Sequence, residues 1–156
     1  MKLLTKNQSE IDYSKIYEFY GVNFNGAENS KGDLEADCFH PECGKENHLR
    51  ISKNTGMFRC LRCGIQGNVY GFFTQYHSIW FQETTPAEYK LLADSRGLTA
   101  QVLREARFAF DSIQERWLVP IENGSEFLNN LGAFYPNSSR KDRFVVKKAP
   151  SLPSLP

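Results

Sequence analysis

Apolar residues change their spacing several times along this chain, and each change predicts a new element. Within residues 11–24 they recur at helical spacing, which predicts a short amphipathic helix. Asp12 can cap the start of this helix, and Gly21 can end it. Residues 25–33 are rich in turn-forming residues, so we expect a loop there.

Residues 34–38 are few enough to form a strand that leads into the first cysteine pair, and polarity alternates along residues 48–52 and 56–60, as it does in strands with one buried face. The last two stretches flank a turn that ends at Gly56, so they predict a β-hairpin. Alternation separates a small apolar core from a basic face. The residues that can fill this core are Leu49, Ile51, and Met57 or Phe58.

Three helices are predicted in the middle of the chain. Asn68 can cap a helix that runs to about residue 77 and carries an aromatic stripe, which we interpret as a buried face. The segment Thr85-Pro86-Ala87-Glu88 combines an N-cap, a proline at N1 and a glutamate at N3, and Gly97 ends the helix that it starts. A third helix follows Thr99 and continues to about residue 106.

From Trp117 onward the pattern indicates strands. Residues 116–121 and 126–131 predict a hairpin with Asn123-Gly124 at its turn, and Pro120 suits an edge position. Residues 133–135 and 143–147 can add further strands, and the proline-rich residues 149–156 are typical of a linker or tail.

All four cysteines lie between residues 38 and 63, and they form two pairs, Cys38 with Cys43 and Cys60 with Cys63. Sixteen residues separate the pairs, which is enough for a two-stranded hairpin that brings both pairs to one point. Two such pairs are what a tetrahedral Zn²⁺ site needs. We therefore predict a zinc ribbon, with these four cysteines as the ligands.

Other interpretations of the cysteines stay open. Iron accepts the same four thiolates, and an even number of cysteines also permits two disulfides. No secretory signal is visible at the N-terminus, and a reducing cytosol disfavours disulfides. His40 could replace Cys38 as a ligand, because His40 and Cys43 are also spaced as a metal-binding pair.

The predicted fold class is α+β: a zinc ribbon with a small antiparallel sheet flanked by helices, then a small helical segment and a C-terminal β-hairpin or sheet. We divide the chain into residues 1–80 (N-terminal helix and ribbon), 81–112 (helical linker), 113–148 (strand region) and 149–156 (tail).

No apolar run approaches the length of a membrane-spanning helix. The net charge is only +1, but five cationic residues stand against two acidic ones between Cys38 and Cys63. A basic hairpin within a neutral chain indicates a local binding surface.

The segment from Asp37 to Phe73 resembles the zinc-binding domain of bacterial and phage DNA primases. The shared features are a first metal pair, a basic strand, an aromatic residue before Cys60-Leu-Arg-Cys63-Gly, and a Gly67-Asn68 pair that opens a helix carrying aromatic residues. The similarity covers residues 11–78 well. Residues 85–135 more loosely resemble the link that follows the ribbon in phage primases and primase-helicases.

Two departures from this family stand out. Its first metal pair normally contains a Cys and a His, whereas here His40 lies between two cysteines. Its members make primers with a TOPRIM domain whose acidic motifs hold catalytic metal ions, yet this sequence contains no Asp-x-Asp. We therefore expect no catalytic residues here, although the chain resembles part of an enzyme.

The resemblance implies that the ribbon recognises a single-stranded DNA template during primer synthesis, in the cytoplasm of a bacterium or a phage-infected cell. Cations would contact phosphates, and flat side chains would stack on bases. The candidate DNA-binding residues are Lys45, His48, Arg50, Lys53, Phe58, Arg59 and Arg62. Implied partners are a replicative helicase or a separate primase catalytic subunit. The alternative function is a non-catalytic module that docks on a helicase or polymerase subunit.

Overall fold

The computed structural model describes residues 11–43, 46–122, 128, 130–136 and 144–146. Within them the chain forms two compact units, an N-terminal unit (Met1–Phe72) and a C-terminal unit (Phe73–Pro156). The division falls inside one helix, α2 (Val69–Glu83).

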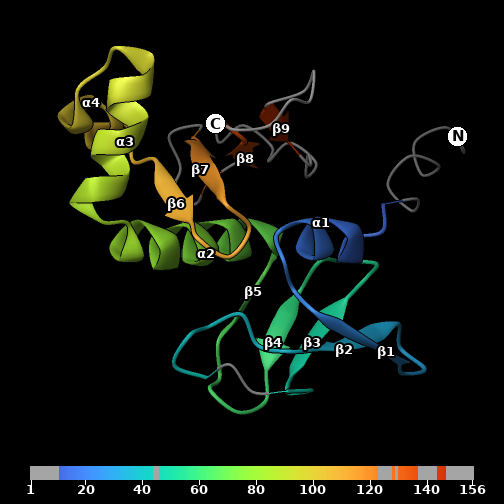
Figure 1. The fold of residues 1–156 in the computed structure, drawn as a ribbon. Coiled ribbons are helices and arrows are strands. Elements are labelled where there is room, and N and C mark those ends of the chain that lie inside the picture. Colours follow the sequence, from blue (N-terminus) through green and yellow to red (C-terminus); the bar gives the residue numbers. More distant parts are fainter. Residues whose placement is uncertain (1–10, 44–45, 123–127, 129, 137–143, 147–156) are drawn as a thin grey trace, which may run out of the picture. The chain divides into compact units, whose positions relative to one another are not determined.

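The N-terminal unit contains a five-stranded antiparallel sheet whose strands are neighbours in chain order (Figure 1). The strands are β1 (Phe24–Glu28), β2 (Asp33–Ala36), β3 (Leu49–Ser52), β4 (Phe58–Cys60) and β5 (Gln66–Gly67). The predicted hairpin of β3 and β4 is confirmed, and so is the strand before the first cysteine pair. The expected loop at residues 25–33 is wrong in its first part, because β1 pairs with β2 through an irregular register.

Aromatic side chains fill the space between this sheet and α1 (Ser14–Phe19). Tyr17 is fully buried, and its ring centroid lies 4.4 Å from that of Phe72 and 6.2 Å from that of Phe58. The Tyr17 hydroxyl donates a hydrogen bond of 2.6 Å to the carbonyl oxygen of Gly56. Burial raises the pKa of Tyr17 well above its ordinary value, so the hydroxyl stays protonated and keeps this bond. The helix is thereby attached to the turn between β3 and β4.

Local start signals place the beginnings of the helices, but α1 is shorter than the stretch 11–24 in which it was predicted. Asp12 accepts a hydrogen bond of 3.0 Å from the backbone nitrogen of Ser14 at the start of α1, and the Asn68 side chain accepts one of 2.9 Å from Gly71 in α2. Thr85 and Glu88 form the predicted capping box of α3 (Pro86–Arg96), and Thr99 caps α4 (Ala100–Glu105). Helix α2 is six residues longer than predicted, since it ends at position 83 and not near 77.

The C-terminal unit contains an antiparallel sheet in the order β6-β7-β8-β9. Its strands are β6 (Ala109–Asp111), β7 (Arg116–Ile121), β8 (Asn130–Phe134) and β9 (Phe144–Val146). Strand β6 was not predicted, because three residues are too few to show a period. Pro120 lies in β7, which has β6 and β8 as neighbours. Strand β6 pairs with β7 only as far as Leu118, so Pro120 faces no partner in β6 and costs no hydrogen bond there. The Asn123-Gly124 turn and the 149–156 tail lie outside the described residues.

Helices α3 and α4 pack on this sheet through one apolar cluster of buried residues: Tyr89, Leu92, Ala93, Leu103 and Trp117. A buried ion pair lies in the same unit, where Arg116 Nε is 3.3 Å from Asp111 Oδ2. The Tyr76 hydroxyl donates to the same carboxylate oxygen at 3.0 Å. Both sheets are therefore antiparallel with helices beside them, and the predicted α+β fold class is confirmed.

Replacing Gly56 by alanine will destabilise the N-terminal unit. Gly56 has a φ of +76°, and an added Cβ would lie 2.7 Å from the Tyr13 ring. We expect a loss of about 2–4 kcal/mol in the free energy of unfolding, from backbone strain and overpacking together. Gly26→Ala is the matched control, because Gly26 has a φ of +81° but no atom within 4 Å of the added Cβ. Urea titrations of zinc-loaded protein followed by circular dichroism will show equal losses if the Tyr13 contact is irrelevant.

Acidification will destabilise the C-terminal unit through His77. This side chain is 1% exposed, and its Nε2 donates a hydrogen bond of 2.6 Å to the carbonyl oxygen of Arg107. Burial lowers the pKa of His77 below its ordinary value of 6.5. At a pH between the pKa values of His77 in the unfolded and folded states, the unfolded chain binds a proton that the folded unit does not. The contribution of neutral His77 to stability is therefore complete above about pH 6.5 and falls as the pH decreases.

The fluorescence of Trp80 and Trp117, the two tryptophans of the chain, reports on this unit. Urea midpoints measured by this fluorescence should fall between pH 7.5 and pH 5.5, and they should fall less in His77→Gln. An equal fall in both proteins would show that His77 is not the responsible group.

Candidate functional site

Four thiols converge at one end of the ribbon sheet. Cys38 follows β2 and Cys60 ends β4, while Cys43 and Cys63 lie in the turns beyond these strands. The Sγ atoms of Cys38 and Cys63 are 3.8 Å apart, those of Cys43 and Cys60 are 3.7 Å apart, and all four lie within 4.8 Å of one another. Residues that are twenty-five positions apart in the sequence thus meet at a single point.

The sulfur spacing fits a zinc ion. With Zn–S bonds of about 2.3 Å, the edges of a regular ZnS₄ tetrahedron are about 3.8 Å long. A disulfide would need sulfurs about 2.05 Å apart, and all four cysteines are free thiols. The donor set and its spacing therefore match a structural zinc site, and we propose all four cysteines as its ligands. Zinc bound there cross-links the two turns.

Backbone hydrogen bonds shape both turns. The nitrogen of Cys43 donates to the carbonyl oxygen of His40 at 3.0 Å, and that of Gly64 donates to the carbonyl oxygen of Cys60 at 3.1 Å. Gly64 has a φ of +82°, which is the left-handed region that glycine reaches without strain. These short closures point two thiols from each turn toward the same place.

The thiols differ in how readily they lose a proton. Burial raises the pKa of Cys38 well above its ordinary value, and the neighbouring thiols add to this effect. Burial also acts to raise the pKa of Cys60, but N–H groups of Cys63 and Arg62 donate to its sulfur and lower the pKa to about 7. A metal ion must displace the remaining protons, so binding will release protons near neutral pH.

His40 lies outside the group of four thiols. Its side chain is half-buried, and its Nδ1 accepts a hydrogen bond of 3.3 Å from the backbone nitrogen of Glu42. This contact orients the ring within its own turn, and we keep the four cysteines as the proposed ligand set with His40 as the alternative.

A row of polar side chains crosses the face of the sheet opposite the aromatic core. Glu35 pairs with Arg50, Arg50 with Arg59, and Arg59 with Gln66 across successive strands. Directly paired residues of antiparallel strands share one face, whereas Leu49, Ile51 and Phe58 alternate with them and are buried. We call this face the outer face of the ribbon.

The outer face is hollowed into an open groove of about 600 Å³. Arg50 and Arg59 line it together with Asp33, Ser52 and Gln66. Met57 and Leu61 also line the groove, and their side chains are 52% and 59% exposed. The sequence did not identify Asp33, Ser52, Gln66 or Leu61 as site residues, and it indicated Met57 only as a candidate for the core. A signal for this face was present in the sequence. Alternate strand residues point to opposite faces, so the odd-numbered residues near Cys38 and Cys60 lie on the face opposite to these two cysteines.

The other candidate DNA-binding residues are placed differently. Phe58 is 2% exposed and contacts Phe39 and Phe72, so its ring is in the core and is not available for stacking on a base. Lys53 is ion-paired with Glu28 at 2.6 Å. Arg62 is exposed in the second cysteine turn, and Lys45 lies outside the described residues.

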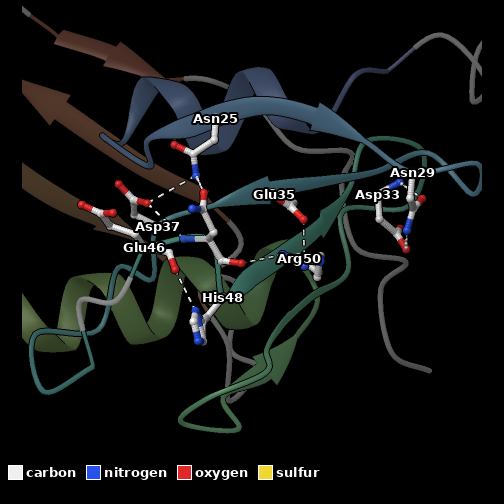
Figure 2. A network of polar contacts seen from close by, with 9 residues as sticks. Asn25, Asn29, Asp33, Glu35, Asp37, Glu46, His48 and Arg50 are labelled. Atoms are coloured by element: carbon white, nitrogen blue, oxygen red, sulfur yellow. Dashed lines mark hydrogen bonds and ion pairs between the residues drawn. The ribbon is translucent and has the colours of Figure 1, made fainter.

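A polar network joins the first cysteine turn to the outer face (Figure 2). Asp37, next to Cys38, accepts hydrogen bonds from the side chain of Asn23 at 3.0 Å and from the backbone nitrogen of Asn47 at 3.3 Å. The Asn23 contact lowers the pKa of Asp37, so this carboxylate stays charged. His48 Nδ1 bonds the carbonyl oxygen of Glu46 at 2.7 Å, which ties this candidate into the same segment.

A family model agrees with the four-thiol site. Residues 6–107 match the family model described as CHC2 zinc finger, the zinc ribbon of DnaG. Among solved structures, the chain is similar to the zinc-binding and RNA polymerase domains of the Aquifex aeolicus primase, with 15% identity and a TM-score of 0.35. That match covers 92% of this chain and 53% of the other, so the chain spans about half the length of the solved one. No curated protein matches the chain. Among the described residues, no helix combines the length and apolarity needed to cross a membrane.

Zinc retention will separate the two ligand sets. If the four cysteines bind the metal, Cys38→Ser will lose stoichiometric zinc, whereas His40→Ala will keep it, because a three-thiolate site binds zinc more weakly. Metal content of reduced, purified protein measured by elemental analysis after dialysis against a mild chelator gives the answer. Zinc loss in His40→Ala together with retention in Cys38→Ser would reverse the assignment, and stoichiometric iron in the native protein would replace zinc as the metal.

Proposed function

Since the chain belongs to the CHC2 zinc-finger family, the zinc ribbon of DnaG-type primases, we propose that its N-terminal unit binds the single-stranded DNA template of primer synthesis. The observation that carries this proposal is the outer face, where Arg50 and Arg59 lie side by side across β3 and β4 in an open groove. The strand to be bound is in the cytoplasm of a bacterium or of a phage-infected cell.

The chemistry of the groove suits an unpaired strand. Guanidinium groups bind phosphates and also stack on base faces, so two neighbouring arginines can follow a flexible backbone. The apolar side chains of Met57 and Leu61 offer contact to unstacked bases, which duplex DNA keeps covered. Gln66 and Ser52 supply neutral hydrogen-bonding groups within the same groove. A mixed surface of this kind fits a single strand better than a duplex.

Zinc would contribute by holding the scaffold. A site closed by four thiolates has no open position for water or substrate, so the ion supplies a structural cross-link at the ends of β2 and β4. The sheet carries the arginines, and the cross-linked turns hold the strands in register. In this proposal the chain contributes template binding, and the polymerising centre belongs to another part of the primase.

A second function, docking on a helicase or polymerase subunit, is favoured by the same exposed Met57 and Leu61. Large exposed apolar side chains within a polar rim are typical of protein interfaces. Binding to a purified replication partner, with no binding to oligonucleotides, would favour this alternative. A primer-synthesis assay with ribonucleotides, run on this chain alone, tests the non-catalytic part of the proposal, because primers made by the chain alone would contradict it.

Replacing Arg59 by glutamine will weaken single-stranded DNA binding. One lost phosphate contact should lower the affinity about three- to tenfold at about 50 mM salt, and the slope of log K against log salt should flatten by about 0.7. Fluorescence anisotropy with a labelled oligonucleotide measures both quantities. The control is Lys15→Gln, which removes one exposed cation from α1, where the side chain is 73% exposed. Equal effects of the two substitutions would show that the outer face is not the binding surface.

A further inference from the structure

We propose that Glu35 occupies the phosphate-binding position of Arg50, so that a nucleic-acid strand binds the outer face by exchanging one of its phosphates for the Glu35 carboxylate. This inference rests on the proposed function and concerns how that site is regulated. It follows from the contacts of one guanidinium group and from the register of three neighbouring strands.

The Arg50 guanidinium is held from two sides. Its Nη2 lies 2.9 Å from Glu35 Oε1, and its Nη1 donates a hydrogen bond of 2.7 Å to the carbonyl oxygen of Asn47 (Figure 2). The side chains of Arg50 and Glu35 are 31% and 35% exposed, so solvent and solutes reach the pair. A carboxylate and a phosphate offer oxygens of similar geometry to a guanidinium, and each can replace the other.

The contact with Asn47 stays in place when Glu35 leaves. Asn47 has a φ of +62°, and its backbone nitrogen donates to Asp37, which is also bonded by Asn23. The Asn47 backbone is therefore held by contacts with Asp37 that do not depend on Glu35. Because one edge of the guanidinium remains oriented by this carbonyl, little reorganisation is needed when a phosphate takes the other edge.

The neighbouring Arg59 makes the exchange favourable. Arg50 and Arg59 are directly paired across β3 and β4, and like charges in this position repel. Among the residues that the structure describes, Glu35 is the carboxylate ion-paired with Arg50, and Arg59 is in no ion pair. A phosphate placed between the two arginines would offset the charge of both, whereas Glu35 is paired across the strands only with Arg50. The nucleic acid can thus contact Arg59 directly, and it contacts Arg50 after displacing Glu35.

The test is the affinity of the zinc-loaded 156-residue chain carrying Glu35→Gln for a fluorescein-labelled single-stranded oligonucleotide of about 12 nucleotides. Exposed ion pairs are weak, so removing the competing carboxylate should raise the affinity only about two- to fivefold. The salt slope should steepen by up to about 0.7, because the displaced Glu35 no longer takes up a cation from solution. Zinc content and circular dichroism confirm that the variant is folded.

Glu18→Gln is the matched control. Glu18 is also the carboxylate of an exposed ion pair, 3.6 Å from Lys15 on α1, and its substitution changes the net charge by the same amount. A second measurement repeats Glu35→Gln in an Arg50→Gln background, where there is no guanidinium left to uncover. The proposal expects the gain in affinity to be absent from Glu18→Gln and from the Arg50→Gln background.

Each result has a definite meaning. A gain that is equal in Glu35→Gln and Glu18→Gln, a gain that persists without Arg50, or no gain at all overturns the inference. If the native chain binds the oligonucleotide and Arg59→Gln weakens that binding while Glu35→Gln has no effect, only the inference fails. If the native chain does not bind single-stranded DNA at all, the proposed function fails first.

Discussion

Four thiols that meet within 4.8 Å of one another are the constraint on which the N-terminal unit depends. The sheet beside them has strands of two to five residues, and such a small sheet has little apolar area to bury. A metal ion shared by the turn after β2 and the turn after β4 replaces part of the missing core, because metal binding and folding are one equilibrium in small zinc domains. Because this cross-link joins the turns that follow β2 and β4, it also holds the residues of the outer face in place.

The two faces of this sheet have separate tasks. One face carries the buried side chains of Leu49, Ile51 and Phe58, and Phe58 contacts the aromatic rings of Tyr17 in α1 and Phe72 in α2. The opposite face carries an open groove. The arginines of β3 and β4 fall on this opposite face because alternate residues of a strand point in opposite directions. The residues that stabilise the unit and those proposed to bind DNA thus alternate along the same short strands.

Local signals in the sequence were enough for the helix starts and the cysteine turns, but not for the end of α2. The capping box of Thr85 and Glu88 and the left-handed Gly97 set the limits of α3 without help from distant residues. Strands β1 and β6 were not predictable in the same way. In β1, turn-forming residues take an extended conformation because β2 offers backbone partners, and β6 consists of three residues that pair with β7. Pairing of this kind depends on a partner strand and leaves little trace in the strand's own sequence.

The sequence alone determined the spacing of four metal-binding thiols, the helix caps and the alternation of the hairpin strands, because each depends on residues a few positions apart. Tertiary structure decided which face each alternating residue takes, so that Phe58, a candidate for stacking on bases, is 2% exposed in the core. It also decided the partner of Arg50, since Glu35 is fifteen positions away and reaches the guanidinium only through the register of β2 against β3. Register is set by packing and metal-held turns acting together, and neither acts on a segment by itself.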